Sequence, residues 1–218
     1  MKKTLKAFSL FLALATVFAS LSLVGFAAEN FVPGVCRHLT CEYVEVGREA
    51  PFAAFDEDAE YIVVGIDLDS EHDDGALMGF VMNADPSDVP ERVEIKDGRI
   101  YGGSGDSFNG EITWDENALS QACLWTPVAH MKLALRNQMT GKYLGSLPGV
   151  RTWDSIWGAD CVWFQPDNSV CMSYYTTLGD APLYSYSLQY NPNVHQFYTA
   201  DENLPSNVRL FRKVVKVY

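Results

Sequence analysis

Residues 93–103 read VEIKDGRIYGG, and this stretch decides the fold class. Val93 and Ile95 alternate with polar residues before the Asp97-Gly98 pair, and an apolar run returns after it. Alternation with a period of two is typical of a strand with one buried face. Asp-Gly between two such runs is a strong signal of a β-hairpin, because both turn positions need positive φ. The stretch therefore predicts two antiparallel strands joined by a tight turn.

Short strand signals recur on both sides of this hairpin. The runs YIVVGI (61–66) and ALMGFVM (76–82) precede it, and CVWFQPDNSVCMSYY (161–175) and PLYSYSLQYN (182–191) follow it. Strands at a spacing of roughly ten residues, with turn formers between them, are typical of an all-β sandwich or barrel. We therefore expect an all-β fold.

The stretch KLALRNQMTGKYLGS (132–146) contains a Gly-Lys pair that resembles part of a phosphate-binding loop. Such a loop requires a Gly five residues before the second Gly, a Ser or Thr after the Lys, and a following helix. Here Tyr143 follows Lys142, and Leu133 and Leu135 alternate with polar or small residues. The stretch therefore predicts another hairpin with the Gly-Lys pair in its turn.

The N-terminus has the pattern of a secretory signal peptide. Three lysines in MKKTLKAF precede an uncharged run that ends on small residues near Ala27. We predict a signal peptide over residues 1–27, a lead-in segment over 28–56, a folded domain over 57–218, and secretion of the protein. A retained membrane anchor is the alternative, because the uncharged run is long enough to span a bilayer.

The charge balance narrows the class of partner. The chain carries 16 basic and 28 acidic residues, a net charge of −12. Such a surface repels nucleic acid and anionic lipid, so we expect a glycan or an extracellular protein surface as the partner. No motif indicates a cofactor, and we expect no membrane insertion after signal cleavage.

Five cysteines are present, and export permits disulfides. Cys161 and Cys171 lie on the two strands of one predicted hairpin and would face each other if its loop were residues 165–167. We predict a disulfide between them if the geometry allows it. Cys36, His38 and Cys41 in CRHLTC could supply three metal ligands, but the fourth is missing, and an ordinary segment is favoured.

The order of the strand-like pieces resembles the β-trefoil-like modules of secreted and surface proteins from Gram-positive anaerobic bacteria. The matching pieces are Tyr61–Gly65, Ala76–Val81, Val93–Ile100, Leu124–Thr126, Leu135–Leu144, Trp153–Trp163, Leu183–Tyr186, Phe197–Ala200 and Val208–Lys213. The resemblance implies a closed β-barrel capped by hairpins, with a β-sandwich as the alternative. It implies no single activity. The Gln-x-Trp triplet of sugar-binding trefoils of the ricin type is absent.

No sequence motif indicates catalysis. The chain contains neither the Gly-x-Ser-x-Gly motif of serine hydrolases nor the His-Glu-x-x-His motif of zinc proteases, so we predict no catalytic residue. The cluster DLDSEHDDG (67–75) resembles a calcium loop, but His72 replaces the required Gly and the twelfth position is not Glu. A solvated loop is favoured, and calcium binding by Asp67–Asp74 stays open.

The stretch RTWDSIWGADCVWF (151–164) favours binding. It places Trp153, Trp157 and Trp163 close together, with Asp154 among them. Flat aromatic faces stack on sugar rings and carboxylates accept hydroxyl hydrogen bonds, and one helical turn would place Trp153 and Trp157 on the same side. Burial of these rings as core, expected for at least one of the three, is favoured over a ligand platform, and core is also expected for the alternating tyrosines at 184 and 186.

We therefore expect a secreted, non-catalytic module that binds carbohydrate through Trp153, Asp154, Trp157 and Trp163. One alternative is an inhibitor of a secreted protease that uses the loop GGSGDSFNG (102–110) or the loop after Gly145. A second is a protein–protein interaction domain.

Overall fold

The computed structural model describes residues 35–46, 59–70, 75–109, 111–129, 133–146, 149–175 and 184–218. Residues 34–218 form one compact unit. Strands dominate the described ranges, and the only helical elements there are two single 3₁₀ turns, η3 (Gln121–Cys123) and η4 (Ile156–Gly158). The predicted signal peptide, residues 1–27, lies outside the described residues.

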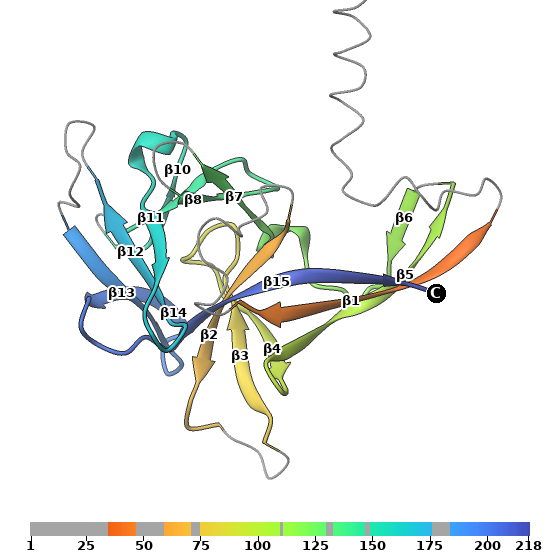
Figure 1. The fold of residues 1–218 in the computed structure, drawn as a ribbon, viewed down its shortest axis with the longest axis horizontal. Coiled ribbons are helices and arrows are strands. Elements are labelled where there is room, and N and C mark those ends of the chain that lie inside the picture. Colours follow the sequence, from red (N-terminus) through yellow and green to blue (C-terminus); the bar gives the residue numbers. More distant parts are fainter. Residues whose placement is uncertain are drawn as a thin grey trace, which may run out of the picture. The chain divides into compact units, whose positions relative to one another are not determined.

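Two antiparallel sheets make up the fold (Figure 1). The larger sheet has the order β10-β9-β8-β7-β2-β15-β1-β5-β6, and β3 joins it beside β2 and carries β4. Its strands are β1 (Cys36–Glu45), β2 (Tyr61–Asp67), β3 (Leu77–Val81), β4 (Glu91–Ile95), β5 (Arg99–Phe108), β6 (Glu111–Trp114), β7 (Trp125–Ala129), β8 (Leu133–Asn137), β9 (Tyr143–Gly145), β10 (Arg151–Trp153) and β15 (Val208–Val217). The smaller sheet is a meander of β11 (Cys161–Phe164), β12 (Val170–Tyr174), β13 (Tyr184–Asn191) and β14 (Gln196–Asp201).

The turn predicted between residues 93 and 103 is confirmed. Asp97 and Gly98 have φ of 51° and 66°, and Lys96 and Arg99 exchange two backbone hydrogen bonds of 2.9 Å. The hairpin does not continue beyond this pair, because β4 forms its ladder with β3 while β5 forms a longer ladder with β1. The turn therefore joins two strand pairs of the larger sheet.

Strand β1 lies in the interior of the larger sheet. It pairs with β5 along one edge and with β15 along the other. Leu39, Cys41 and Tyr43 alternate inward and are almost completely buried. Residues 36–45, which were expected to belong to the lead-in segment, are thus part of the sheet, with His38, Thr40 and Glu42 on the outward face of the strand.

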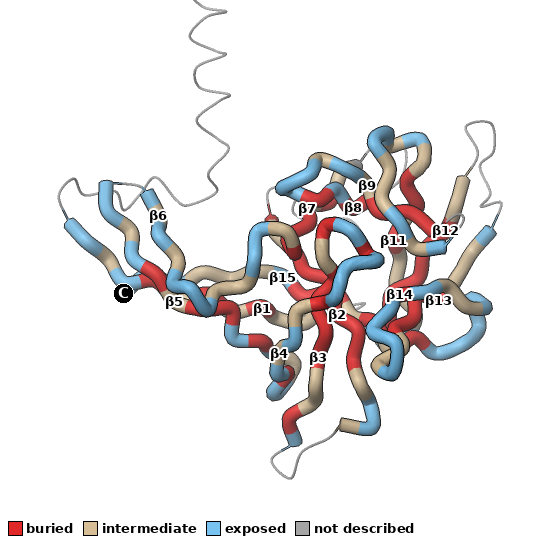
Figure 2. Tube along the Cα trace, turned by 180° about the vertical axis from the view of Figure 1, so that it is seen from behind, coloured by how far each residue is buried: buried red, intermediate tan, exposed pale blue. Residues whose placement is uncertain are grey.

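The main hydrophobic core lies between the two sheets. Tyr61, Val63 and Trp125 from the larger sheet meet Met172 and Leu188 from the smaller one in one buried cluster. Strand β2 is buried on both faces, as its continuous apolar run implies, and the buried parts of β2, β12 and β13 are red in Figure 2. A second cluster packs on the other face of β2 and includes Ile62, Val64, Tyr43 and Phe211.

The prediction of an all-β fold is confirmed, but the closed barrel implied by the trefoil resemblance is not formed in the described part of the chain. Both sheets remain open, and a sandwich-like arrangement fits them. Barrel closure requires the first and last strands of one sheet to pair, and here the chain splits its strands between two sheets instead. Among the described residues β4 pairs only with β3, and the bridge between Lys96 and Arg99 lies beyond the end of β4.

The glycine-rich stretch 102–110 is not the exposed loop that the inhibitor hypothesis required. Residues 102–108 belong to β5, which pairs with both β1 and β6. A Cβ at Gly102 would lie 2.4 Å from the Tyr43 ring, and one at Gly105 would lie 2.4 Å from the carbonyl oxygen of Thr113. These glycines therefore allow close packing of strands, a role that composition does not distinguish from loop flexibility.

Candidate functional site

The predicted tryptophan platform does not form, because Trp153 has a packing role. Its half-buried ring lies between Gly145 of β9 and Gly158 of η4. A Cβ on either glycine would come within 2.7 Å of the ring, so both positions exclude any larger residue without rearrangement. The guanidinium of Arg151 lies 5.1 Å from the ring centre. Trp153 thus fixes η4 against the larger sheet.

Two further residues of the predicted site, Asp154 and Trp157, lie on the exposed chain after β10. Trp157 belongs to the short 3₁₀ turn η4 and is 51% exposed, whereas Trp153 ends a strand. The expected single helical turn through both rings is therefore absent. The Asp154 side chain is exposed and its carboxylate lies 3.6 Å from the Lys142 ammonium. Asp160, in contrast, is completely buried and accepts a hydrogen bond from the Ser146 hydroxyl.

Trp163 lies on the smaller sheet, on the face opposite the core. Its indole N–H donates to the Ser173 hydroxyl at 2.8 Å, and Ser173 bonds to Ser185 on the next strand. The predicted disulfide between Cys161 and Cys171 is not formed in the structure. The turn spans Gln165–Ser169 rather than 165–167, and this shift places Cys171 opposite Trp163 and Cys161 opposite Ser173.

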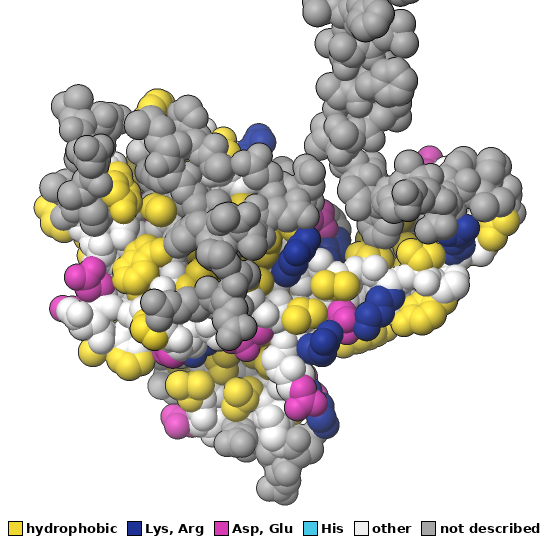
Figure 3. Space-filling view, in the orientation of Figure 1, with side chains coloured by type: hydrophobic (Ala, Val, Ile, Leu, Met, Phe, Trp, Pro, Cys, Tyr) yellow, Lys and Arg dark blue, Asp and Glu magenta, His cyan; other side chains and the backbone are white. Residues whose placement is uncertain are grey.

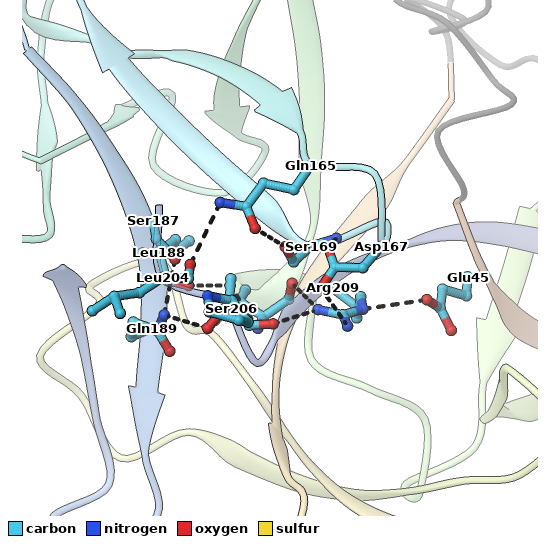
Figure 4. A network of polar contacts seen from close by, with 12 residues as sticks. Glu45, Gln165, Asp167, Ser169, Ser187, Leu188, Gln189, Leu204, Ser206 and Arg209 are labelled. Carbon is cyan, nitrogen blue, oxygen red and sulfur yellow. Dashed lines mark hydrogen bonds and ion pairs between the residues drawn. The ribbon is translucent and has the colours of Figure 1, made fainter. Parts of the chain in front are cut away.

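The chain between β14 and β15 is hydrogen-bonded to the smaller sheet and to the β11–β12 turn (Figure 4). Gln165 donates to the carbonyl oxygen of Glu202, and Gln189 donates to that of Pro205 at 2.8 Å. Ser206 donates to the carbonyl oxygen of Leu188. These bonds attach the chain between β14 and β15 to the smaller sheet, and Trp163 does not line the depression at the end of β13 and β14.

An open depression of about 710 Å³ lies at the end of β13 and β14. Tyrosine, serine and threonine side chains line it together with acidic and amide groups: Tyr184, Ser185, Tyr186, Thr199, Ala200, Asp201, Glu202 and Asn203. Hydrophobic and acidic side chains lie next to each other on the part of the surface formed by the smaller sheet, at the left of Figure 3. This depression is the candidate site.

The alternation of β13 explains why aromatic rings reach this surface. Leu188 and Tyr190 on one face of the strand are buried in the core, and Tyr186 and Tyr184 continue that face toward solvent. Tyr184 is 52% exposed, and its ring stacks on that of Tyr186 with centres 6.3 Å apart and planes 24° apart. The strand therefore runs past the end of the core and presents two ordered, flat rings.

A carboxylate stands beside these rings. Asp201 lies opposite Tyr186 in the ladder between β13 and β14. The backbone N–H and the side-chain amide of Asn203 both donate to one Asp201 carboxylate oxygen at 2.9 Å, and these bonds lower the pKa of Asp201. Burial raises the pKa of the Tyr186 hydroxyl, with further contributions from Tyr184 and Asp160. An ionised carboxylate thus lies on the strand that pairs with the one carrying the two tyrosines.

The sequence signal for this site was present but was assigned to the core. A period of two predicts which residues share a face, and it correctly grouped Tyr184 with Tyr186. It does not predict where along the strand the opposing sheet ends. The Asp-x-Asn spacing of Asp201 and Asn203 was a usable sign of an ordered polar turn at the end of β14.

The sequence offered two possible metal sites, one in residues 36–41 and one in the acidic loop that begins at Asp67. Cys36 and His38 point to one face of β1 while Cys41 is buried on the other, so the three side chains do not converge. Within the described ranges, no group of three potential metal-ligating residues occurs. In the acidic loop, Asp67 accepts a hydrogen bond from the N–H of Asp69, and residues 71–74 lie outside the described residues.

Comparisons with protein-family models, curated proteins and solved structures found no match to this chain. Of the helices in the described ranges, none has the length and apolar character needed to cross a membrane.

Proposed function

We propose that the protein is an exported carbohydrate-binding module and that the depression at the end of β13 and β14 is its glycan site. The observation that carries this proposal is the stacked Tyr184–Tyr186 pair in an open depression lined by Asp201, Glu202 and Asn203. Export rests on the N-terminal pattern of three lysines followed by an uncharged run.

The chemistry of the lining suits a saccharide. Sugar rings have apolar faces that stack on aromatic rings, and their hydroxyls need both hydrogen-bond donors and acceptors at the edge of the ring. The tyrosine rings supply the stacking surface. Asp201, Asn203 and Thr199 supply the hydrogen-bond donors and acceptors. Because the depression is open, it suits a segment of a longer glycan better than a small molecule, which would be enclosed.

The test is glycan binding by matched variants of the folded chain. Tyr184→Ala and Tyr186→Ala each remove one ring, and we expect each to weaken binding at least about fivefold, since a stacked ring contributes roughly 1 kcal/mol beyond its area. Tyr101→Ala is the control, because Tyr101 is a 68% exposed strand tyrosine on the other sheet. A thermal melt of each variant confirms folding.

A third variant separates this site from the one predicted by the sequence. Trp157→Ala removes the exposed ring of η4 and should leave glycan affinity unchanged. Loss of binding in Trp157→Ala with retention in both tyrosine variants would contradict the proposal.

Binding to a protein is the second candidate, and the edge of β14 favours it. Among the described strands β14 pairs only with β13, and Tyr198 on it is 43% exposed. An edge strand of this kind can accept an extended peptide as an additional strand. A protein ligand bound in this way would persist in the double variant Tyr184→Ala/Tyr186→Ala and would be lost when a proline replaces Tyr198.

A further inference from the structure

The charges around the depression have one sign. Asp201 and Glu202 belong to its lining, and none of its lining residues in the described part of the chain is Lys or Arg. The aromatic floor therefore lies in a negative local field, within a chain whose net charge is −12.

Asp201 is placed to contact a group bound on the rings. Residues directly opposite in an antiparallel ladder have Cβ atoms about 5 Å apart, so a sugar stacked on Tyr186 lies within reach of the Asp201 carboxylate. The two hydrogen bonds from Asn203 occupy one carboxylate oxygen and hold the group in position. A cation over a tyrosine face gains a second attraction from the ring itself.

We propose that this site selects glycans that carry free, positively charged amino groups over their N-acetylated and acidic counterparts. The inference rests on the proposed function and specifies its ligand class. An ammonium group of a 2-amino-2-deoxy sugar can donate charge-assisted hydrogen bonds to Asp201 while the sugar ring stacks on Tyr186. An N-acetyl group offers no charge to this carboxylate, and an acidic sugar is repelled by it.

A matched pair of ligands tests the proposal. Fully deacetylated and fully N-acetylated oligomers of β-1,4-linked glucosamine, equal in length, differ only in the charge and acylation of the nitrogen. Calorimetry at about pH 5.5 keeps the amines protonated and Asp201 ionised, because its pKa is lowered. We expect the deacetylated oligomer to bind about tenfold more tightly, with the preference shrinking as salt is raised.

Variants assign the preference to the site. Asp201→Asn keeps an oxygen that accepts the Asn203 hydrogen bonds but removes the charge, and we expect it to bring the two affinities to within about twofold of each other. Asp88→Asn is the control: Asp88 is exposed in the turn between β3 and β4 of the other sheet, and the same charge is lost there. It should keep the tenfold preference.

These experiments distinguish a failure of the proposed selectivity from a failure of the proposed function. Equal affinity of the wild-type protein for the two oligomers would overturn the selectivity and leave glycan binding intact. An equal loss of preference in Asp88→Asn and Asp201→Asn would overturn it too, because the net charge of the chain would then be the cause. Failure to bind these oligomers and any uncharged glycan would instead contradict the proposed function.

Discussion

The Trp153 ring fills a space that two glycines keep open, and it should behave as a core residue although it is only half-buried. Trp153→Ala should lower the free energy of unfolding by about 2–3 kcal/mol, somewhat below the range for fully buried tryptophans. Gly158→Ala should also destabilise the fold, because the new Cβ would lie 2.6 Å from the ring. Urea unfolding of the two variants measures both effects.

Trp157→Ala serves as the control for that prediction. Its ring is 51% exposed, so we expect a change below about 0.5 kcal/mol. Equal destabilisation by Trp157→Ala and Trp153→Ala would show that the two rings share one role, contrary to the packing described above.

The cysteines provide a second prediction for single residues. Cys36 is exposed, whereas Cys41, Cys123 and Cys171 are buried, and burial raises the pKa of each of these three thiols. Because the thiolate is the reactive form, a thiol reagent at pH 8 should modify Cys36 rapidly and the buried three only on unfolding. Mass spectrometry of peptides from a time course checks the order. Early modification of Cys171 would contradict it.

Single residues also show how much of the candidate site could be predicted from the sequence. It grouped Tyr184 with Tyr186 on one face of a strand, which is correct, and it placed both in the core, which is wrong for Tyr184. It named Trp153 as a candidate ligand residue while favouring core for the tryptophans, and the structure gives Trp153 a packing role. Aromatic residues suit both environments, so their identity alone does not decide between them.

At the scale of elements, the turn 96–99 is the clearest test of backbone geometry. Gly98→Ala should cost about 1–2 kcal/mol of unfolding free energy, because φ of 66° is unfavourable for any residue with a Cβ. The space around Gly98 is open, with Glu45 atoms no nearer than 3.7 Å, so steric overlap contributes nothing. Asp97→Asn, which suits the same φ, is the control and should be neutral. Chemical denaturation distinguishes the two, and a neutral Gly98→Ala would refute the turn geometry.

Arg209 joins elements of both sheets. Its guanidinium lies 3.5 Å from Glu45 of β1 and 3.8 Å from Asp167 in the β11–β12 turn, and it donates to the Ser206 carbonyl oxygen at 2.7 Å (Figure 4). Arg209→Met should cost about 1–2 kcal/mol, because it keeps the aliphatic stem but leaves two carboxylates without their cation. Arg99→Met breaks an exposed pair with Glu42 and should cost less than about 0.5 kcal/mol.

That comparison is measured by urea unfolding at low and high salt. The Arg209 variant should differ from wild type mainly at low salt, where the ion pairs are least screened. Equal effects of the two substitutions would show that Arg209 contributes no more than a surface pair.

Individual strands and turns were predicted more accurately than the pairing between strands. The turn at Asp97-Gly98 and the hairpin between β8 and β9 follow from local residue preferences, which the sequence displays directly. Whether β4 continues beside β5 depends on β1 and β3, whose pairing is set by contacts distant in the sequence. The register of the β11–β12 hairpin also depended on a turn longer by two residues, which was enough to separate Cys161 from Cys171.

The whole molecule should lose stability in alkaline solution. Burial raises the pKa of Cys171 and of Tyr190 each to about 12, above their values in an unfolded chain. Above about pH 8.5 the unfolded chain therefore binds fewer protons than the native one, so the free energy of unfolding falls as pH rises. Urea unfolding between about pH 7 and pH 10, with reductant, measures the slope.

Cys171→Ala identifies the group responsible. Above about pH 8.5, the free energy of unfolding should fall less steeply with pH in the variant than in wild type, whatever the stability of the variant at pH 7. An unchanged slope would show that the Cys171 thiol does not contribute.

Sheet closure is a property of the whole molecule. The trefoil resemblance implied a closed barrel, whereas both sheets of the described chain are open. The order of strand-like pieces along a chain is compatible with a closed barrel and with two open sheets, because both bury the same alternating faces. The two sheets share a core in which residues of β2 and β7 meet residues of β12 and β13. That contact places β13 so that its first two tyrosines lie beyond the core.

The central claim is that glycans bind at the end of β13 and β14. The most direct measurement is a set of backbone amide chemical shifts of the ¹⁵N-labelled protein during titration with the deacetylated oligomer. We predict that the shifted amides cluster at residues 184–186 and 199–203. Shifts confined to the stretch 151–158 around Trp153 and Trp157 would contradict the account and restore the tryptophan platform.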